Sequence, residues 1–171
     1  MADDESSIVI CDAGPLIHLE ELGSIDLLLA FARICVPDTV WEKVRLHRPS
    51  ALRKRRVKLI RVVDLQQPTP ELRSLLQTFA LDAGEAAAFR LMQEIPNATL
   101  LTDDSAARLL AVRMGYDVHG TIGVILRGMR HGLRTKRRVL NLLRAIPERS
   151  TLHIAKKVLA AVIEQVLESA S

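Results

Sequence analysis

The sequence predicts an α/β fold, a three-layer α/β/α sandwich with a central parallel sheet of about five strands. Short β-branched or aliphatic runs such as SIVIC (7–11) and ATLLT (98–102) are typical of buried strands. Amphipathic stretches of helical period separate these runs, and strands that alternate with helices form βαβ units around a parallel sheet. With 171 residues, 49% of them hydrophobic, the chain has the size of one domain with a substantial core.

Each predicted strand is a short apolar run with a breaker or polar residue at its end. Pro37 ends the second run, because proline cannot donate a ladder hydrogen bond. The expected strands are residues 7–11, 33–37, 57–63, 98–102 and 116–120.

Helix start and stop signals divide the remaining sequence. Thr69 followed by Pro70 is a strong start, and Gly115 closes a helix. Ser24 and Asp38 are predicted N-caps of their helices. The basic segment 45–56 has no clean apolar period, so we expect a loop or a frayed helix end there. Within residues 12–23, Gly14 and Pro15 are expected to form a turn into a short helix. The other expected helices are residues 24–32, 38–45, 69–80, 81–95 and 105–115, and two or three helices at 121–132, 135–146 and 151–169 finish the chain.

The domain organisation follows from the same segments. We expect a flexible tail at 1–6, one domain at 7–149, and a last helix at 150–171 that packs on this domain or forms a dimer contact. The start MADDESS has no signal-peptide pattern, and no apolar run reaches the roughly 20 residues that span a bilayer. Cys11 and Cys35 are expected to be buried, reduced thiols, so we expect a cytoplasmic protein without a membrane contact.

Basic residues are concentrated in two blocks of the chain. Residues 43–61 hold nine Lys or Arg and no carboxylate, and residues 118–147 hold seven more, again without a carboxylate. Such blocks are either solvated faces or the contact surface for a polyanion, most simply nucleic acid. With only 3% aromatic residues, stacking platforms for bases are not expected. The candidate nucleic-acid-binding residues are Arg53, Lys54, Arg55, Arg56, Lys136, Arg137 and Arg138.

Acidic residues follow or precede the predicted strands at one edge of the sheet. Asp12 follows the first strand, Asp103 and Asp104 follow the fourth, and Glu85 lies in the first turn of the helix that leads into the fourth. Ligands of open parallel sheets bind beyond the carboxyl ends of the strands. A divalent cation would relieve the repulsion among converging carboxylates, and such sites suit Mg²⁺ or Mn²⁺.

Each of these carboxylates also has a structural interpretation. Asp82 and Glu85 have the spacing of a capping box. Asp103 has the position of a helix N-cap, and Asp104 has the spacing of an i,i+4 ion pair with Arg108. Both interpretations stay open at this point.

Four segments resemble, in order and spacing, the motifs of the PIN-domain nucleases. They are VICDAGPLIHL, VPDTVWEKV, LDAGEAAAFRL and LLTDDSAARLLAVRMGYDVHGTIGVI. The resemblance covers about residues 8–130 and is closest to the bacterial and archaeal group with D-x-G-E, D-D-x-x-x-R and G-T-x-G patterns. It implies a divalent-metal-dependent ribonuclease that acts on RNA, often as a homodimer and as the toxin partner of a small antitoxin protein.

The resemblance also implies roles for individual residues. Asp12, Glu85 and Asp104 match the catalytic, metal-binding set, with Asp103 beside them as a further metal ligand. In this interpretation Asp12 and Asp104 are inner ligands, and Glu85 is a ligand or orients the attacking water. The accessory candidates are Glu42, Thr121, whose hydroxyl caps the next helix or binds a metal-bound water, and Arg108.

Two positions depart from the family's pattern. Lys43 stands where many members have an acidic residue, and Glu42 lies one place earlier. Gly14 stands where many members have Ser or Thr. The alternative function is therefore a catalytically impaired PIN-like domain that acts as a nucleic-acid- or protein-binding module. His18 and His119 lack metal-ligand spacing and are expected to be structural.

Overall fold

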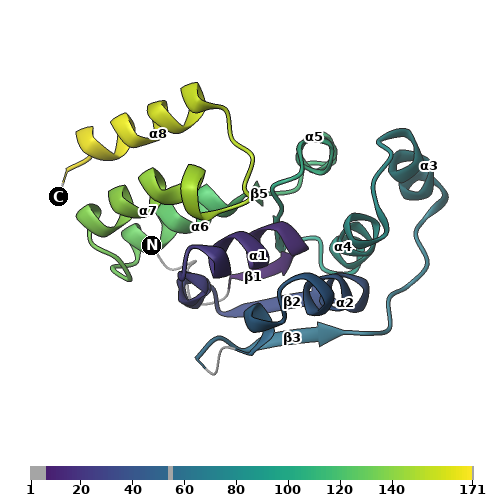
Figure 1. The fold of residues 1–171 in the computed structure, drawn as a ribbon. Helices are drawn as coiled ribbons and strands as arrows, with labels where there is room; N and C mark the ends of the chain where they lie inside the picture. Colours follow the sequence, from purple (N-terminus) through teal and green to yellow (C-terminus); the bar gives the residue numbers. More distant parts are fainter. Residues whose placement is uncertain (1–6, 54–55, 171) are drawn as a thin grey trace.

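The structure is a computed structural model that describes residues 7–53 and 56–170 (Figure 1). The predicted tail at 1–6, and Lys54 and Arg55 of the nucleic-acid-binding set, lie outside the described residues. A five-stranded, all-parallel sheet with the order β3-β2-β1-β4-β5 forms the centre and confirms the predicted fold class. Its strands are β1 (Ile8–Cys11), β2 (Arg33–Pro37), β3 (Leu59–Val62), β4 (Thr99–Leu101) and β5 (Val118–His119).

The strand register sets the position of the site. β1 lies between β2 and β4, which is where the strand order changes direction. Cys11 pairs with Leu101, and the Asp12 N–H donates to the Leu101 carbonyl at 2.9 Å. The residues that follow β1 and β4 therefore leave the sheet side by side, at the switch point where α/β proteins bind ligands.

Helices cover both faces of the sheet (Figure 1). Alternate side chains of the strands divide the core into two parts, because successive residues of a strand point to opposite faces. Val9 and Cys11 pack on one face, whereas Ile10 and Cys35 pack on the other, and both thiols are buried and free. The first face is covered by α1 (Ala13–Glu21), α2 (Asp38–His47), α6 (Thr121–Arg130) and α7 (Lys136–Arg149). The second is covered by α3 (Pro70–Thr78), α4 (Ala83–Glu94) and α5 (Ser105–Arg113).

The last helix, α8 (Lys156–Glu168), forms an outer layer against α7 (Figure 1). Its Leu159 and Val166 are buried and belong to the core. None of the helices that the structure describes is long and apolar enough to cross a bilayer.

Some sequence-based boundaries were wrong. The segment predicted as a helix at 24–32 is a 3₁₀ helix, η1 (Ile25–Ala30), and Ser24 makes no side-chain cap. Asp38 is the first residue of α2 instead of its cap, because its carboxylate binds Arg61 at 2.6 Å. α8 begins at Lys156 instead of residue 151, because the Thr151 N–H and hydroxyl bind Glu21 in an extended segment.

The basic segment after α2 contains a short 3₁₀ helix, η2 (Pro49–Leu52). α2 itself extends to His47, so the start of this segment is helical.

Candidate functional site

Asp12 is a buried carboxylate at the carboxyl end of the central strand. Its side chain is the N-cap of α1, with Oδ1 accepting the Ala13 N–H at 2.8 Å. Oδ2 accepts the hydroxyl of Thr102 at 3.0 Å, and the residue is only 5% exposed. Burial raises the pKa of Asp12, although both hydrogen bonds oppose that rise. The fold thus holds one anionic group in a fixed position at the switch point.

Thr102 connects two of the predicted site residues, and sequence reasoning did not identify it. Its hydroxyl donates to Asp12 and accepts the backbone N–H of Asp104 at 3.2 Å. Thr102 is 1% exposed and follows β4 directly. A buried hydroxyl needs polar partners, so a threonine between an apolar strand and two aspartates was the available signal.

The N-terminus of α4 lies against the Asp12 carboxylate. A Cβ placed on Gly84 would be 3.9 Å from Asp12 Oδ1 and 3.3 Å from Asp82 Oδ1. Asp82 and Glu85 form a capping box, which confirms the structural interpretation of their spacing. The Glu85 Oε2 accepts the Asp82 N–H, and Asp82 Oδ1 accepts the Glu85 N–H, both at 2.8 Å. Glu85 therefore lies on the same rim as Asp12.

The carboxyl group of Glu85 has a strongly raised pKa. Burial raises its pKa to about 7, and the nearby charges of Asp82, Asp104 and Asp12 add to the rise. The hydrogen bond with Asp82 opposes it. Beyond the effect of burial, part of this rise therefore comes from repulsion among carboxylates of three separate segments at this rim.

Lys43 places a positive charge among these acids. Its Nζ donates to Asp82 Oδ2 at 2.8 Å, reaching from α2 to the start of α4. This hydrogen bond raises the pKa of Lys43, as do the charges of Asp12 and Glu85. Lys43 stands where many members of the PIN-domain pattern have an acidic residue, and its ammonium group thus faces the acidic rim.

Asp103 is saturated by hydrogen bonds from two other elements. Oδ2 accepts from His18 Nδ1 at 2.8 Å and from the Thr121 hydroxyl at 2.6 Å, and Oδ1 accepts the Thr121 N–H at 2.7 Å. These bonds lower the pKa of Asp103 against the effect of burial. Asp103 therefore joins α1 to the start of α6, and the Thr121 hydroxyl neither caps its own helix nor faces Asp12. His18, which was expected to be structural, binds Asp103 through Nδ1.

Asp104, and not Asp103, is the N-cap of α5. Its Oδ1 accepts the Ala107 N–H at 2.8 Å. No ion pair with Arg108 forms among the described residues, so the expected i,i+4 pair is absent. Asp104 is exposed, and its Oδ2 accepts no hydrogen bond from the residues that the structure describes. One oxygen of this carboxylate faces solvent.

Glu42 is turned away from the rim. Its carboxylate binds Arg45 at 2.7 Å and Arg61 at 2.9 Å on the exposed side of α2. Glu42 thus serves a surface ion-pair network, while its neighbour Lys43 occupies the position near Asp82.

Of the predicted nucleic-acid-binding residues that the structure describes, Arg56 and Arg138 come together, whereas Lys136 is engaged elsewhere. Lys136 Nζ donates to the carbonyls of Leu167 and Ser169 at 2.7 Å, so it satisfies the C-terminal end of α8. Arg53 and Arg137 are exposed. Arg56 and Arg138 line a common hollow elsewhere on the molecule.

The rim has carboxylate oxygens that could bind a metal ion, but these oxygens do not surround a common point. Within residues 7–53 and 56–170, no group of three or more His, Cys, Asp or Glu side chains is arranged to hold a metal ion. Asp12, Glu85 and Asp104 nevertheless offer carboxylate oxygens, which are the ligands that Mg²⁺ and Mn²⁺ prefer. The mutual repulsion at Glu85 is what a cation would relieve. The donor set therefore fits a hard divalent cation in its chemistry.

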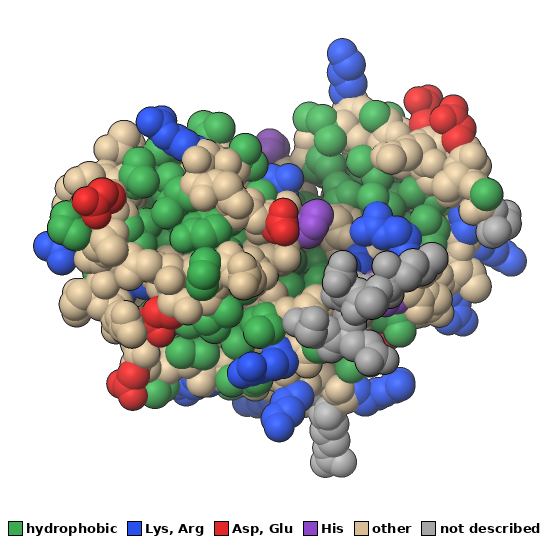
Figure 2. All heavy atoms as spheres, turned by 180° about the vertical axis from the view of Figure 1, so that it is seen from behind, with side chains coloured by type: hydrophobic (Ala, Val, Ile, Leu, Met, Phe, Trp, Pro, Cys, Tyr) green, Lys and Arg blue, Asp and Glu red, His purple; other side chains and the backbone are tan. Residues whose placement is uncertain are grey.

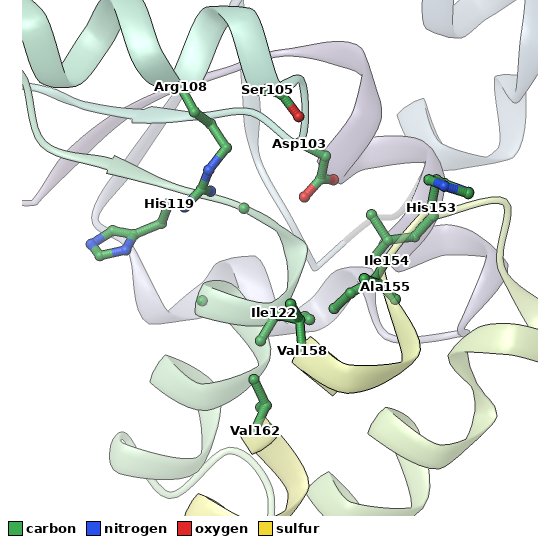
Figure 3. A pocket seen from close by; sticks show the side chains of 13 residues that line it. Asp103, Ser105, Arg108, His119, Ile122, His153, Ile154, Ala155, Val158 and Val162 are labelled. Carbon is green, nitrogen blue, oxygen red and sulfur yellow. The ribbon is translucent and has the colours of Figure 1, made fainter. Parts of the chain in front are cut away.

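A cavity of about 410 Å³ adjoins the rim on the side of α5 and α6. Figure 3 shows Asp103 and Arg108 on one side of it, and Ile122, Ile154 and Val158 on the other. The guanidinium group of Arg108 has no hydrogen-bond or ion-pair partner among the described residues. Volumes of this size hold small ligands or parts of larger ones. The cavity can take an anionic group next to an apolar one.

A comparison with known protein families identifies the family of this chain. A family model described as a PIN domain matches residues 8–168, which is nearly the whole chain. A search of curated proteins gives no match. PIN domains are generally nucleases and typically use divalent metal ions. On this match and on its five-stranded parallel sheet, the chain belongs to the PIN-domain family.

Proposed function

We propose that this protein is a divalent-metal-dependent endoribonuclease that hydrolyses RNA phosphodiester bonds. One observation carries the proposal, namely that Asp12, Glu85 and Asp104 come from three segments and interact electrostatically at one rim of the sheet. Family membership supports a nuclease, and the cavity beside the rim supports a nucleotide substrate.

The residues of the rim have different roles in the proposed reaction. Asp12, Glu85 and Asp104 would hold a Mg²⁺ or Mn²⁺ ion, which would lower the pKa of bound water and neutralise charge on the phosphate. The Ala13 N–H and the Thr102 hydroxyl keep Asp12 in one orientation. Glu85 accepts the Asp82 N–H at Oε2, which leaves Oε1 to bind the ion or to orient a water molecule.

Arg108 has the position to bind the substrate backbone. Its guanidinium group lies near Gly120, with Nη1 only 3.1 Å from a Cβ placed there, and lines the cavity beside Asp103. Because it has no partner among the described residues, it is available for a phosphate oxygen of RNA. A toxin role, with a small antitoxin protein as partner and a homodimer as the assembly, extends this proposal on the strength of the family resemblance.

Cleavage assays with matched variants test the proposal. Asp12→Asn and Asp104→Asn are expected to reduce Mn²⁺-dependent cleavage of single-stranded RNA by about 100-fold or more, with unchanged circular dichroism. Asp117→Asn is the control, because Asp117 is an exposed carboxylate that precedes β5, at the opposite end of the strands. Full activity of either rim variant would refute the proposed site.

A second candidate function is favoured by one contact. The Lys43 ammonium group pairs with Asp82 and interacts with the charges of Asp12 and Glu85, so it already supplies a cation at the rim. If Lys43 takes the place of the metal ion, the protein binds RNA without cleaving it. Binding of RNA by the wild-type protein, without any cleavage in Mn²⁺ or Mg²⁺, would identify this function.

A further inference from the structure

A basic hollow lies at the end of the molecule opposite the acidic rim. It has a volume of about 640 Å³ and is lined by Arg56, Arg134, Arg138 and Arg149, with Asp26 as the one acidic lining residue. α1 begins at the rim and runs back across the sheet, and the residues after it, Leu22 to Ser24, form part of the lining. The two sites thus lie near opposite ends of one helix.

Three of the four guanidinium groups have no partner among the described residues. Arg134 binds both oxygens of Asp26, at 2.7 and 2.8 Å. The guanidinium groups of Arg56, Arg138 and Arg149 make no hydrogen bond or ion pair with any residue that the structure describes. Unpaired like charges around one hollow repel, and an anion with several acceptor oxygens would relieve that repulsion.

The hollow is assembled by tertiary structure. Arg138 and Arg149 are eleven residues apart on α7, a spacing that places them on one face three turns apart. Gly23 turns the chain beneath them with a φ of 62°, and Arg149 Nη2 lies 3.9 Å from the place of a Cβ on this glycine. Arg56 arrives from the loop that follows η2, far away in the sequence. In the rear view of Figure 2, Lys and Arg side chains are frequent over the lower and right parts of the molecule.

We infer that this hollow is a second RNA-binding site, which holds backbone phosphates away from the place of cleavage. This inference rests on the proposed function. Three free guanidinium groups and a polar lining suit successive phosphates, which arginine binds in bidentate fashion. The nine residues of α1 span about 14 Å, and stacked nucleotides advance about 3.4 Å each. A stacked strand that reaches both sites therefore spans about four nucleotides, so the hollow favours longer RNA.

RNA binding in EDTA tests the inference, because no cleavage occurs without metal. The probes are fluorescein-labelled single-stranded oligoribonucleotides of about 20 and about 3 nucleotides, lengths that do and do not span the two sites. For the double variant Arg138→Ala/Arg149→Ala, we expect about tenfold weaker binding of the long probe, and a smaller loss for the short one because it brings fewer phosphates to the hollow. The slope of log Kd against log salt should also fall by about one to two.

Arg144→Ala is the matched control. Arg144 lies six residues from Arg138, on another face of α7, and does not line the hollow. It should bind both probes as the wild type does. If the double variant is unfolded by circular dichroism, the single variant Arg138→Gln replaces it, with about threefold weaker binding of the long probe expected.

The outcomes separate this inference from the proposed nuclease activity. Long-probe affinity and salt slope that equal those of Arg144→Ala would overturn the RNA site. If the double variant binds RNA more weakly than the wild type does, but the wild type never cleaves RNA, the proposed nuclease activity is refuted and the RNA-binding hollow is supported. Where cleavage occurs, the double variant should raise KM for long RNA and leave kcat unchanged.

Discussion

Replacing Lys43 by methionine tests the electrostatics of the acidic rim. The side chain keeps its length but loses the charge that sits 2.8 Å from Asp82 Oδ2. Lys43 and Asp82 are 41% and 47% exposed, so solvent screens the pair strongly. At a separation of about 4 Å in a water-like dielectric, unit charges interact by about 1 kcal/mol. Discounted for exposure, the pair contributes about 0.5 kcal/mol to the unfolding free energy without metal.

The same loss of charge should strengthen cation binding. Lys43 also interacts with Asp12 and Glu85, so its removal makes the potential at the rim more negative. We expect the Kd for Mn²⁺ to fall about two- to fivefold, which corresponds to about 0.4–1 kcal/mol. Isothermal titration calorimetry gives the Kd, and thermal shift against Mn²⁺ concentration gives an independent value.

Arg45→Met is the matched control for this experiment. Arg45 lies on the same helix, but its partner is Glu42, on the exposed side away from the rim. The control should change the Kd for Mn²⁺ by less than Lys43→Met does. Equal or weaker Mn²⁺ affinity in Lys43→Met would refute the idea that Lys43 competes with a cation.

Two further predictions concern stability. Gly120→Ala should destabilise the fold by about 1–3 kcal/mol in urea unfolding, because the new Cβ would lie 2.5 Å from Asp103 Oδ1 and 3.3 Å from the Thr102 carbonyl oxygen. In metal-free protein, Glu85 should make stability fall as pH rises from about 4.5 to about 7, because its folded pKa is raised and the folded state binds more protons in that range. After allowance for solvent screening we expect about 1 kcal/mol, and Glu85→Gln should remove this pH dependence.

Each of these two results has a contradicting outcome. An unchanged urea midpoint for Gly120→Ala would mean that Asp103 does not pack against this turn. Gly132→Ala is the control, because a Cβ at Gly132 would meet no atom within 4 Å. The φ of Gly132 is 71°, so that variant reports backbone strain alone. If the stability of Glu85→Gln still falls between about pH 4.5 and about 7, the pH dependence comes from Asp12 instead, because the pKa of Asp12 is also raised.

Local patterns in the sequence were sufficient for the fold class. Strand runs such as 33–37 and start signals such as Thr69 with Pro70 depend on neighbouring residues only, and both appear where they were expected. The Asp82–Glu85 capping box is local as well. The 3₁₀ helix at Ile25–Ala30 was missed because apolar periodicity does not separate it from an α-helix over six residues.

Partner choice among side chains could not be deduced in this way. Asp103 and Asp104 are adjacent and chemically identical, yet one is saturated by His18 and Thr121 and the other caps α5. The difference arises because one side chain faces α1 and α6, whose positions depend on the packing of the core. Asp38 likewise lost its capping role to an ion pair with Arg61, 23 residues away.

The sequence alone determined that this chain forms a parallel α/β sandwich with acidic residues at the carboxyl edge, because period, caps and breakers act over a few residues. Only the tertiary structure decided that Lys43 joins those acids and that Arg56, Arg138 and Arg149 meet at the far end of α1. Charges interact through space, and the distances between them are set by how the helices pack on the sheet.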